Sequence, residues 1–184
     1  MSRTQYYTAT SLDGFLATPD HSLDWLMTRQ QDRAGPLNFG AFIAGVGAIA
    51  MGSTTYEWIL AHEAGTAGTS GDVRWPYRQP SWVFTSRDLP AVRGADIRFV
   101  RGDVAPVHRE MSEAAGGRNQ WVVGGGDLAG QFADRGLLDE VLVMIAPVTL
   151  GAGPPLLPRR IELTLREVAR NGDFACATYT VARG

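Results

Sequence analysis

The apolar and polar positions of this chain follow two patterns, one typical of strands and one typical of helices. Segments of the two kinds alternate from the N-terminus onward. Short apolar runs rich in β-branched and aromatic residues predict buried strands at 6–10, 48–51, 81–85, 97–100, 120–123 and 141–146. The pattern also predicts helices at 37–46, at 107–115 and at 127–138, and Thr54 or Thr55 would cap a further helix. Strands that alternate with helices are typical of an α/β fold with a mostly parallel sheet.

The C-terminal part of the chain has a different pattern, in which two β-type segments follow each other with no helix between them. Residues 162–169 and 175–182 alternate or are β-branched, and they flank Asn171-Gly172, a dipeptide suited to the positive φ angles of a hairpin turn. No linker, repeat or low-complexity segment divides the chain. We therefore expect one domain over residues 1–184, with a mixed, mostly parallel sheet flanked by helices and a C-terminal antiparallel hairpin.

One internal segment, 62–77, shows neither period, because glycine is interleaved there with alanine, threonine and serine. Such a stretch predicts a mobile loop. This loop would act either as a lid over a site or as an insertion without a role.

Composition narrows the class of protein and of partner. With 184 residues, 45% of them hydrophobic, and a net charge of -2, the chain matches an ordinary globular domain and lacks the signature of disorder. Its 17 basic residues are all arginine and are spread along the chain, so we expect no nucleic-acid partner. The longest apolar run, 39–52, is too short and too rich in glycine to span a bilayer, so we expect no membrane partner.

The cysteine and histidine residues argue against a disulfide and against a metal site. The single cysteine, Cys176, cannot form an intramolecular disulfide, and we expect it to be a small buried apolar residue in a cytoplasmic protein. His21, His62 and His108 share no ligand spacing with each other or with Cys176, so we expect no metal. The chain has no lysine, which excludes P-loop and Schiff-base chemistry.

A triple glycine follows directly after the predicted strand that ends at Val123. Gly124, Gly125 and Gly126 lead into a helix that starts at Asp127. Glycines let a phosphate approach the backbone, and the free amides of a helix N-terminus favour an anion. The acid that a full dinucleotide fingerprint places at the end of the next strand is missing here. The alternative is therefore a tight strand-to-helix turn that binds nothing.

Two further segments follow predicted strands in the same way. Gly52-Ser53-Thr54-Thr55 presents three hydroxyls, which would bind a phosphate or simply cap the next helix. Thr85-Ser86-Arg87 combines hydroxyls with a guanidinium, which would bind a phosphate monoester or merely form a solvated strand exit. Ligands bind at the carboxyl ends of parallel strands in open α/β sheets, and all three segments lie at such ends.

Several short motifs, taken in order, resemble the dihydrofolate reductase superfamily. They are Ser11-Leu12-Asp13-Gly14, Asp24-Trp25, 51–57, Thr85-Ser86, 123–126 and Leu138-Asp139-Glu140, and together they cover nearly the whole chain. The resemblance is greatest to the branch that contains the reductase domain of the bifunctional riboflavin-biosynthesis deaminase/reductase and its stand-alone bacterial relatives. It implies bound NADPH and hydride transfer to a small-molecule substrate, a pterin- or aminopyrimidine-type heterocycle or imine.

The resemblance also implies a role for individual residues. The implied cofactor-binding residues are Gly52, Ser53, Thr54, Thr55, Thr85, Ser86, Arg87, Val123, Gly124, Gly125, Gly126, Asp127, Leu128 and Gln131. Ser11, Asp13 and Trp25 would line the substrate side. We expect Asp13 to be the catalytic proton donor, because the first strand should run centrally and its exit should face the glycine turn. The alternative for Asp13 is a turn former that hydrogen-bonds its own backbone.

Two positions depart from the pattern of the superfamily. Dihydrofolate reductases place an acid in the helix before the second strand, but 35–40 contains no carboxylate, which argues against dihydrofolate as the main substrate. The arginine commonly found after the Gly52 position is replaced by Ser53, which leaves Arg87 as the nearest candidate for the adenosine 2′-phosphate. A non-catalytic NADPH- or metabolite-binding protein of the same fold therefore stays open as an alternative. The apolar C-terminal β segment further predicts a homodimer.

Overall fold

The computed structural model describes residues 2–66 and 73–182. The strands are β1 (Thr4–Ser11), β2 (Val46–Gly52), β3 (Ser81–Phe84), β4 (Ile97–Val100), β5 (Asn119–Gly124), β6 (Glu140–Ala146), β7 (Leu163–Asn171) and β8 (Phe174–Val181). The helices are α1 (Asp24–Met27), α2 (Phe39–Ala44), α3 (Ser53–Thr66), α4 (Val104–Ala115) and α5 (Gly126–Asp134).

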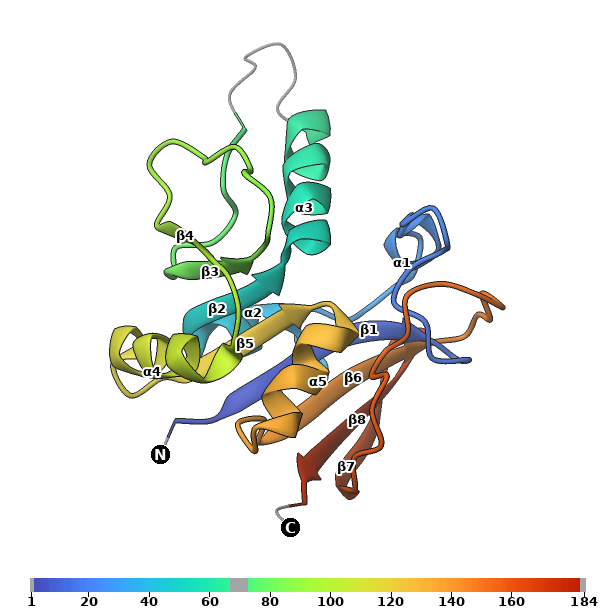
Figure 1. The fold of residues 1–184 in the computed structure, drawn as a ribbon. Coiled ribbons are helices and arrows are strands. Elements are labelled where there is room, and N and C mark those ends of the chain that lie inside the picture. The colour runs from blue at the N-terminus through green and yellow to red at the C-terminus, as the bar shows by residue number, and fades with distance from the viewer. Residues whose placement is uncertain (1, 67–72, 183–184) are drawn as a thin grey trace.

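All eight strands form one mixed sheet in the order β4-β3-β2-β5-β1-β6-β8-β7 (Figure 1). The pairs from β4 across to β6 are parallel, whereas β6–β8 and β7–β8 are antiparallel. The expected fold class is therefore confirmed, including the C-terminal hairpin. The expected central position of the first strand is also confirmed, because β1 lies between β5 and β6.

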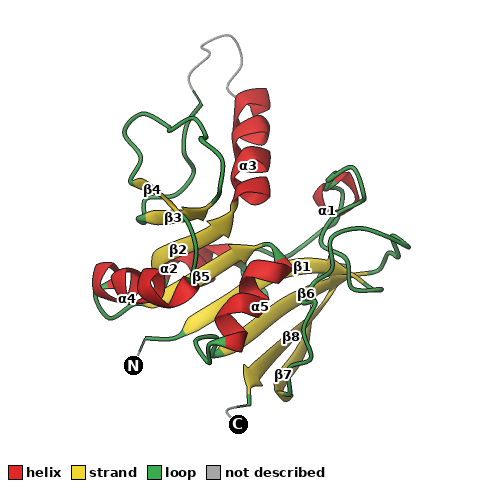
Figure 2. Cartoon of the chain, in the orientation of Figure 1, coloured by secondary structure: helices red, strands yellow, loops and turns green. Residues whose placement is uncertain are grey.

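The sheet separates two hydrophobic cores, one on each face. Figure 2 shows α4 and α5 on the same side of the sheet. Side chains of a strand alternate between faces, so Tyr6 belongs to the core under α4 and α5, and its neighbour Tyr7 belongs to the core on the opposite face. Met111 and Phe132 fill the first core from the two helices, and both are fully buried. The second core includes Trp121 and residues of α3. Covering both faces leaves the strand ends free to form a site.

Three expected helix boundaries are wrong, and each has a local cause. The helix expected at 37–46 is α2, which begins after Asn38, whose side chain accepts a hydrogen bond from the Ala41 amide, and it ends before β2. The helix expected at 107–115 begins at Val104, because Asp103 caps it and a proline is tolerated in a first turn. The helix expected at 127–138 is α5, which ends at Asp134, because Gly136 takes a positive φ of 65° that an α-helix does not continue through.

The expected loop and hairpin turn also need correction. Residues 62–66 of the expected 62–77 loop belong to α3, and the part at 67–72 lies outside the described residues. In the hairpin, Asn171 pairs with Phe174 as the last residue of β7, and Gly172 takes the positive φ of 59°. The Asn171 side chain instead accepts a hydrogen bond from the Asp32 amide and donates one to the Pro36 carbonyl. Asn171 therefore binds a distant loop as well as ending the strand.

Within the described part of the chain, no helix is both long enough and apolar enough to cross a membrane.

Candidate functional site

The carboxyl ends of β3, β2 and β5 meet at one edge of the sheet. These three strands are neighbours, with Gly52 opposite Phe84 and Met51 opposite Gly124. The parallel pairing therefore brings the segments after these strands to the same edge, as the sequence predicts. Two of the three segments line a common cavity, and the third lies beside it.

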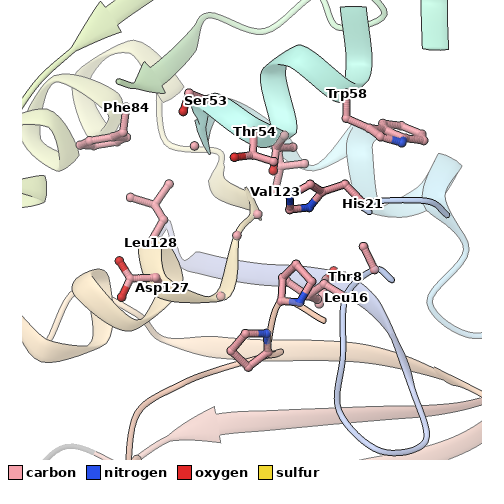
Figure 3. A pocket seen from close by; sticks show the side chains of 18 of the residues that line it. Thr8, Leu16, His21, Ser53, Thr54, Trp58, Phe84, Val123, Asp127 and Leu128 are labelled. Atoms are coloured by element: carbon pink, nitrogen blue, oxygen red, sulfur yellow. The ribbon is translucent and has the colours of Figure 1, made fainter. Parts of the chain in front are cut away.

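The common cavity, called the glycine cavity below, has a volume of about 510 Å³ (Figure 3). The glycine turn after β5 and the first residues of α3 and α5 form one side of it, and the loops at 16–23 and 154–158 form the other. The expected cofactor-binding residues that line it are Gly52, Ser53, Thr54, Thr55, Val123, Gly124, Gly125, Gly126, Asp127, Leu128 and Gln131.

Gly125 and Gly126 of the triple turn are glycine for different physical reasons. A Cβ on Gly126 would lie 2.3 Å from the carbonyl oxygen of Pro155, so this position is glycine because the 154–158 loop packs directly on it. A Cβ on Gly125 would meet nothing within 4 Å, and Gly125 lines the cavity. The tight-turn alternative therefore applies to Gly126, whereas Gly125 keeps the backbone accessible to a ligand.

The three hydroxyls at the start of α3 do not cap the helix. Ser53, Thr54 and Thr55 line the glycine cavity, and none of their hydroxyls has a hydrogen-bond partner among the residues that the structure describes. Helix capping would require one of them to accept from an amide of the first turn. The hydroxyls and the first amides of α3 are thus available to an anion, which the positive end of the helix dipole also favours.

The acid at the start of α5 is held as an anion by its neighbours. The carboxylate of Asp127 accepts hydrogen bonds from Gln131 Nε2 and Arg159 Nη2, both at 2.8 Å. These bonds, that of Gln131 first, lower the pKa of Asp127. Arg159 also donates to Asp134, so it links both ends of the helix to the 154–158 loop. This arginine offsets part of the negative charge of Asp127, because the same guanidinium also pairs with Asp134.

The third segment, Thr85-Ser86-Arg87, lies outside the glycine cavity. Thr85 and Arg87 border a smaller cavity of about 260 Å³, together with Phe99 and Arg101, and Ser86 is exposed and borders neither cavity. The Thr85 hydroxyl accepts from the Arg87 amide at 2.9 Å and orders the turn. The Arg87 guanidinium is paired in a bidentate manner with Glu57 of α3. This arginine therefore starts from a salt bridge that a phosphate would have to replace.

A second cavity, called the aromatic cavity below, adjoins the glycine cavity. It has a volume of about 370 Å³, and the two share Thr8 and Val123 as lining residues. Its lining residues are Tyr7, Thr8, Ala9, Leu26, Met27, Arg29, Gln31, Phe39, Tyr77, Trp121, Val123, Met144 and Phe174. This lining contains one charged side chain, Arg29, and no carboxylate among the described residues.

Aromatic rings form much of the wall of the aromatic cavity. The rings of Tyr7 and Phe42 are stacked with centroids 4.1 Å apart, and those of Phe39 and Trp121 are in a T-shaped arrangement with centroids 5.6 Å apart. Burial raises the pKa of Tyr7 to about 12 and that of Tyr77 to about 12, so both phenols are neutral hydrogen-bonding groups. Such a surface suits a planar ring.

Three expected substrate-side residues, Ser11, Asp13 and Trp25, line neither cavity. The Ser11 hydroxyl donates to Asp13 at 2.6 Å, and the Asp13 carboxylate accepts from the amides of Leu150 and Gly151. The Ser11 hydroxyl first, and then these amides, lower the pKa of Asp13 to about 2. An acid this strong is ionised at neutral pH and holds a loop, which favours the turn-forming alternative; its role as proton donor stays a prediction.

Trp25 packs at the edge of the second core, with a buried indole nitrogen that has no partner among the described residues.

Several lining residues were not expected from the sequence. His21 and Trp58 line the glycine cavity, and Phe39, Tyr77 and Trp121 line the aromatic one. The alternation of strand side chains was the available signal for Trp121, because it shares a strand face with Val123 before the glycine turn. His21 had no signal, since its position depends on the path of an irregular loop.

Comparisons with known proteins agree with this architecture. A family model described as the RibD C-terminal domain matches residues 68–172. The uncharacterized protein YwjB of Bacillus subtilis is 27% identical over 184 residues, 98% of either chain. A putative riboflavin biosynthesis protein from Shewanella sp. PV-4 superimposes with a TM-score of 0.79 at 24% identity, covering 98% of this chain and 99% of its own.

A more distant structure shows the same fold. Dihydrofolate reductase from Enterococcus faecalis, complexed with NADP(H), superimposes with a TM-score of 0.55 at 13% identity, covering 98% of this chain and 97% of its own. The fold expected from the superfamily resemblance is thus confirmed.

Proposed function

The chain belongs to the family of the RibD C-terminal domain, and from this premise we propose that it is an NADPH-dependent reductase of a pterin- or aminopyrimidine-type heterocycle or imine. The observation that carries the proposal is the junction of the two cavities at Thr8 and Val123. One cavity offers helix N-termini, hydroxyls and accessible backbone, which suit a dinucleotide. The other offers aromatic surface, which suits the ring that accepts the hydride.

The residues of the glycine cavity fit a dinucleotide. Gly125 leaves the space that a Cβ would fill, and the hydroxyls of Ser53, Thr54 and Thr55 have no other partner among the described residues. A bound NADPH would supply the hydride. The chain would hold the pyrophosphate at the first turns of α3 and α5 and would exclude water with the loops at 16–23 and 154–158. The Enterococcus faecalis reductase holds NADP(H) in the same fold, which supports this assignment.

The adenosine end of the cofactor would lie toward the smaller cavity. There, Arg87 would exchange its salt bridge with Glu57 for the 2′-phosphate, with Thr85 and Ser86 at the same strand exit. An exposed salt bridge contributes little free energy, so the exchange costs little. This arrangement favours NADPH over NADH.

The aromatic cavity limits the kind of ring that is reduced. Because no carboxylate is among its described lining residues, it lacks a partner for the cationic edge of a protonated pteridine, which argues against dihydrofolate. A planar ring would stack on the aromatic side chains, and Arg29 and Gln31 would hydrogen-bond its polar edge. Solved structures of this fold include a pyrimidine reductase-like protein from Corynebacterium diphtheriae. They also include a diaminohydroxyphosphoribosylaminopyrimidine deaminase/5-amino-6-(5-phosphoribosylamino)uracil reductase from Thermotoga maritima, of which the superposition covers 57%.

A non-catalytic binding protein is the second candidate. The observation that favours it is the position of Asp13, which is outside both cavities and holds the loop at 150–151. In that case, the chain would bind the dinucleotide without turnover.

Two measurements on the purified protein test these candidates. We expect the fluorescence of NADPH to change on binding, and its absorbance to fall when 5-amino-6-(5-phosphoribosylamino)uracil is added as the acceptor and not when dihydrofolate is added. Binding without oxidation by any pyrimidine, pterin or flavin acceptor would favour the binding protein. An absence of NADPH binding would exclude both.

We also infer that the chain forms a homodimer through its C-terminal hairpin. β7 is an edge strand, and its apolar residues Leu163, Leu165 and Val168 are exposed, Val168 by 63%. An exposed apolar edge strand is typical of an interface. Light scattering at micromolar concentration is expected to give a dimer mass, and Leu165→Arg a monomer mass. A wild-type monomer would contradict the inference.

A further inference from the structure

The side chain of His21 points into the glycine cavity from the loop between β1 and α1 (Figure 3). Its imidazole has no hydrogen-bond partner among the residues that the structure describes. The only other charged side chain in the lining of this cavity, as far as the chain is described, is Asp127, which pairs with Arg159. The cavity that would take an anionic dinucleotide therefore has, in its described lining, a single side chain able to become a cation.

The backbone at His21 holds the ring in this position. His21 has a φ of 63°, in the left-handed region that residues with a side chain rarely adopt. The conformation is fixed by a tight turn, in which the His21 amide donates to the Thr18 carbonyl at 2.9 Å and the Ser22 amide donates to the Thr18 hydroxyl at 2.9 Å. A glycine would adopt this conformation without strain. A histidine here is thus retained at an energetic cost, which suggests a use for its side chain.

Charged groups face the imidazole from its own loop and from across the cavity. On its own loop, Asp20 is the adjacent residue, and the Thr18 hydroxyl first and the His21 charge to a smaller extent lower the pKa of Asp20. Across the cavity are Asp127 of α5 and the positive N-terminal ends of α3 and α5. β1, β5 and the 154–158 loop contribute only uncharged lining residues, including Thr8, Val123 and Pro155.

We propose that His21 binds the pyrophosphate of the dinucleotide in its imidazolium form, so that cofactor affinity rises as pH falls; this inference rests on the proposed function. His21 and the first residues of α3 and α5 line the same cavity. A bound pyrophosphate would therefore face an imidazolium and two positive helix ends together. Binding would therefore take up a proton, and the dissociation constant would decrease over the range in which histidines gain a proton, between about pH 8 and about pH 5.

The test is a titration of NADP⁺, which is stable in acid, against wild type and His21→Gln at several pH values. The ratio of the two dissociation constants removes any titration of the ligand itself. We expect this ratio to be close to one at about pH 8 and to reach roughly tenfold or more at about pH 5.5, as for one hydrogen bond to a charged group. Calorimetry in two buffers of different ionisation enthalpy should show proton uptake by wild type and less by the variant.

A second variant separates binding from a structural role. His21→Gly removes the imidazole and relieves the left-handed backbone, so we expect an equal or higher melting temperature together with the same loss of pH-dependent affinity. His108→Gln, which changes an imidazole of α4 outside both cavities, should bind like wild type at every pH. If His21→Gln binds NADP⁺ with the pH dependence of wild type, the role of His21 is wrong. If wild type binds no NADP⁺ at any pH, the proposed function fails and this inference fails with it.

Discussion

The glycine cavity and the aromatic cavity share Thr8 and Val123, yet they are built in opposite ways. The first is made mainly of backbone and short side chains that directly follow two strands, at 52–55 and 124–128. The second is made of large side chains from strand faces, from α2 and from loops that are far apart in the chain. A dinucleotide site thus depends on where strands end, whereas the acceptor site depends on which side chains the sheet brings together.

The largest effect is expected from filling the glycine cavity itself. Gly125→Val places a side chain where no atom lies within 4 Å, so the protein should fold while NADP⁺ and NADPH binding falls below detection. The matched control is Gly126→Ala, whose Cβ would lie 2.3 Å from a backbone oxygen. The control should lower the melting temperature, which Gly125→Val should leave nearly unchanged. A Gly125→Val protein that still binds NADP⁺ would show that the turn has only a packing role.

The next effect concerns the adenosine end of the glycine cavity. Arg87→Gln removes the proposed cation for the 2′-phosphate, and a hydrogen bond to a charged group is worth about 1.5–3 kcal/mol. We expect the preference for NADPH over NADH to fall by roughly tenfold or more, with NADH affinity almost unchanged. Competitive fluorescence titrations of both cofactors measure this. Equal affinity of wild type for the two cofactors would already refute the role.

A smaller effect is expected in the aromatic cavity, where a substitution should weaken binding of the acceptor and not of the cofactor. Phe39 is 41% exposed, so Phe39→Ala should cost little stability but remove a ring from the acceptor site. An aromatic pair contributes about 0.5–1.5 kcal/mol, so the KM for the acceptor should rise roughly two- to tenfold while NADPH affinity stays constant. Phe99→Ala, which removes an exposed ring beside Arg87, is the matched control. It should change NADPH affinity and leave the acceptor KM unchanged.

The smallest effect is expected outside both cavities, at Asp13. Its pKa of about 2 lies below the ordinary value, so the ionised form stabilises the folded state at neutral pH. That stabilisation is complete above the ordinary carboxyl pKa and is lost as pH falls toward about 2. Asp13→Asn should therefore melt slightly below wild type at neutral pH, and the difference should vanish in acid. A tenfold loss of turnover with normal NADPH binding would instead restore Asp13 as proton donor.

The contrast between the cavities also explains how far the sequence could predict the molecule. The glycine turn and the hydroxyls after β2 were predictable because their signal is local, a strand followed at once by glycine and a helix start. Even the early start of α4 had a local signal. Aspartate is a preferred N-cap residue, and the Asp103 carboxylate accepts a hydrogen bond from the Ala105 amide.

The aromatic cavity had no such signal. It combines Tyr7, Phe39, Tyr77, Trp121 and Phe174, and in the sequence each is indistinguishable from an ordinary core residue. The same limit applies to Asn171, whose sequence context indicates a turn but whose side chain binds the 32–36 loop. Contacts of this kind depend on the register of strands distant in sequence, which local patterns do not encode.

The bond between Asp13 and the 150–151 amides has a consequence for motion. It is one of a row of links between the 12–16 and 148–156 segments, which include Leu12 to the Val148 carbonyl, Leu16 to the Pro154 carbonyl and Leu156 to the Gly14 carbonyl. Both segments lead into walls of the glycine cavity. If either segment moves to open that cavity, all of these hydrogen bonds break together. Their amides should therefore exchange with deuterium at one common rate, although they are far apart in the chain.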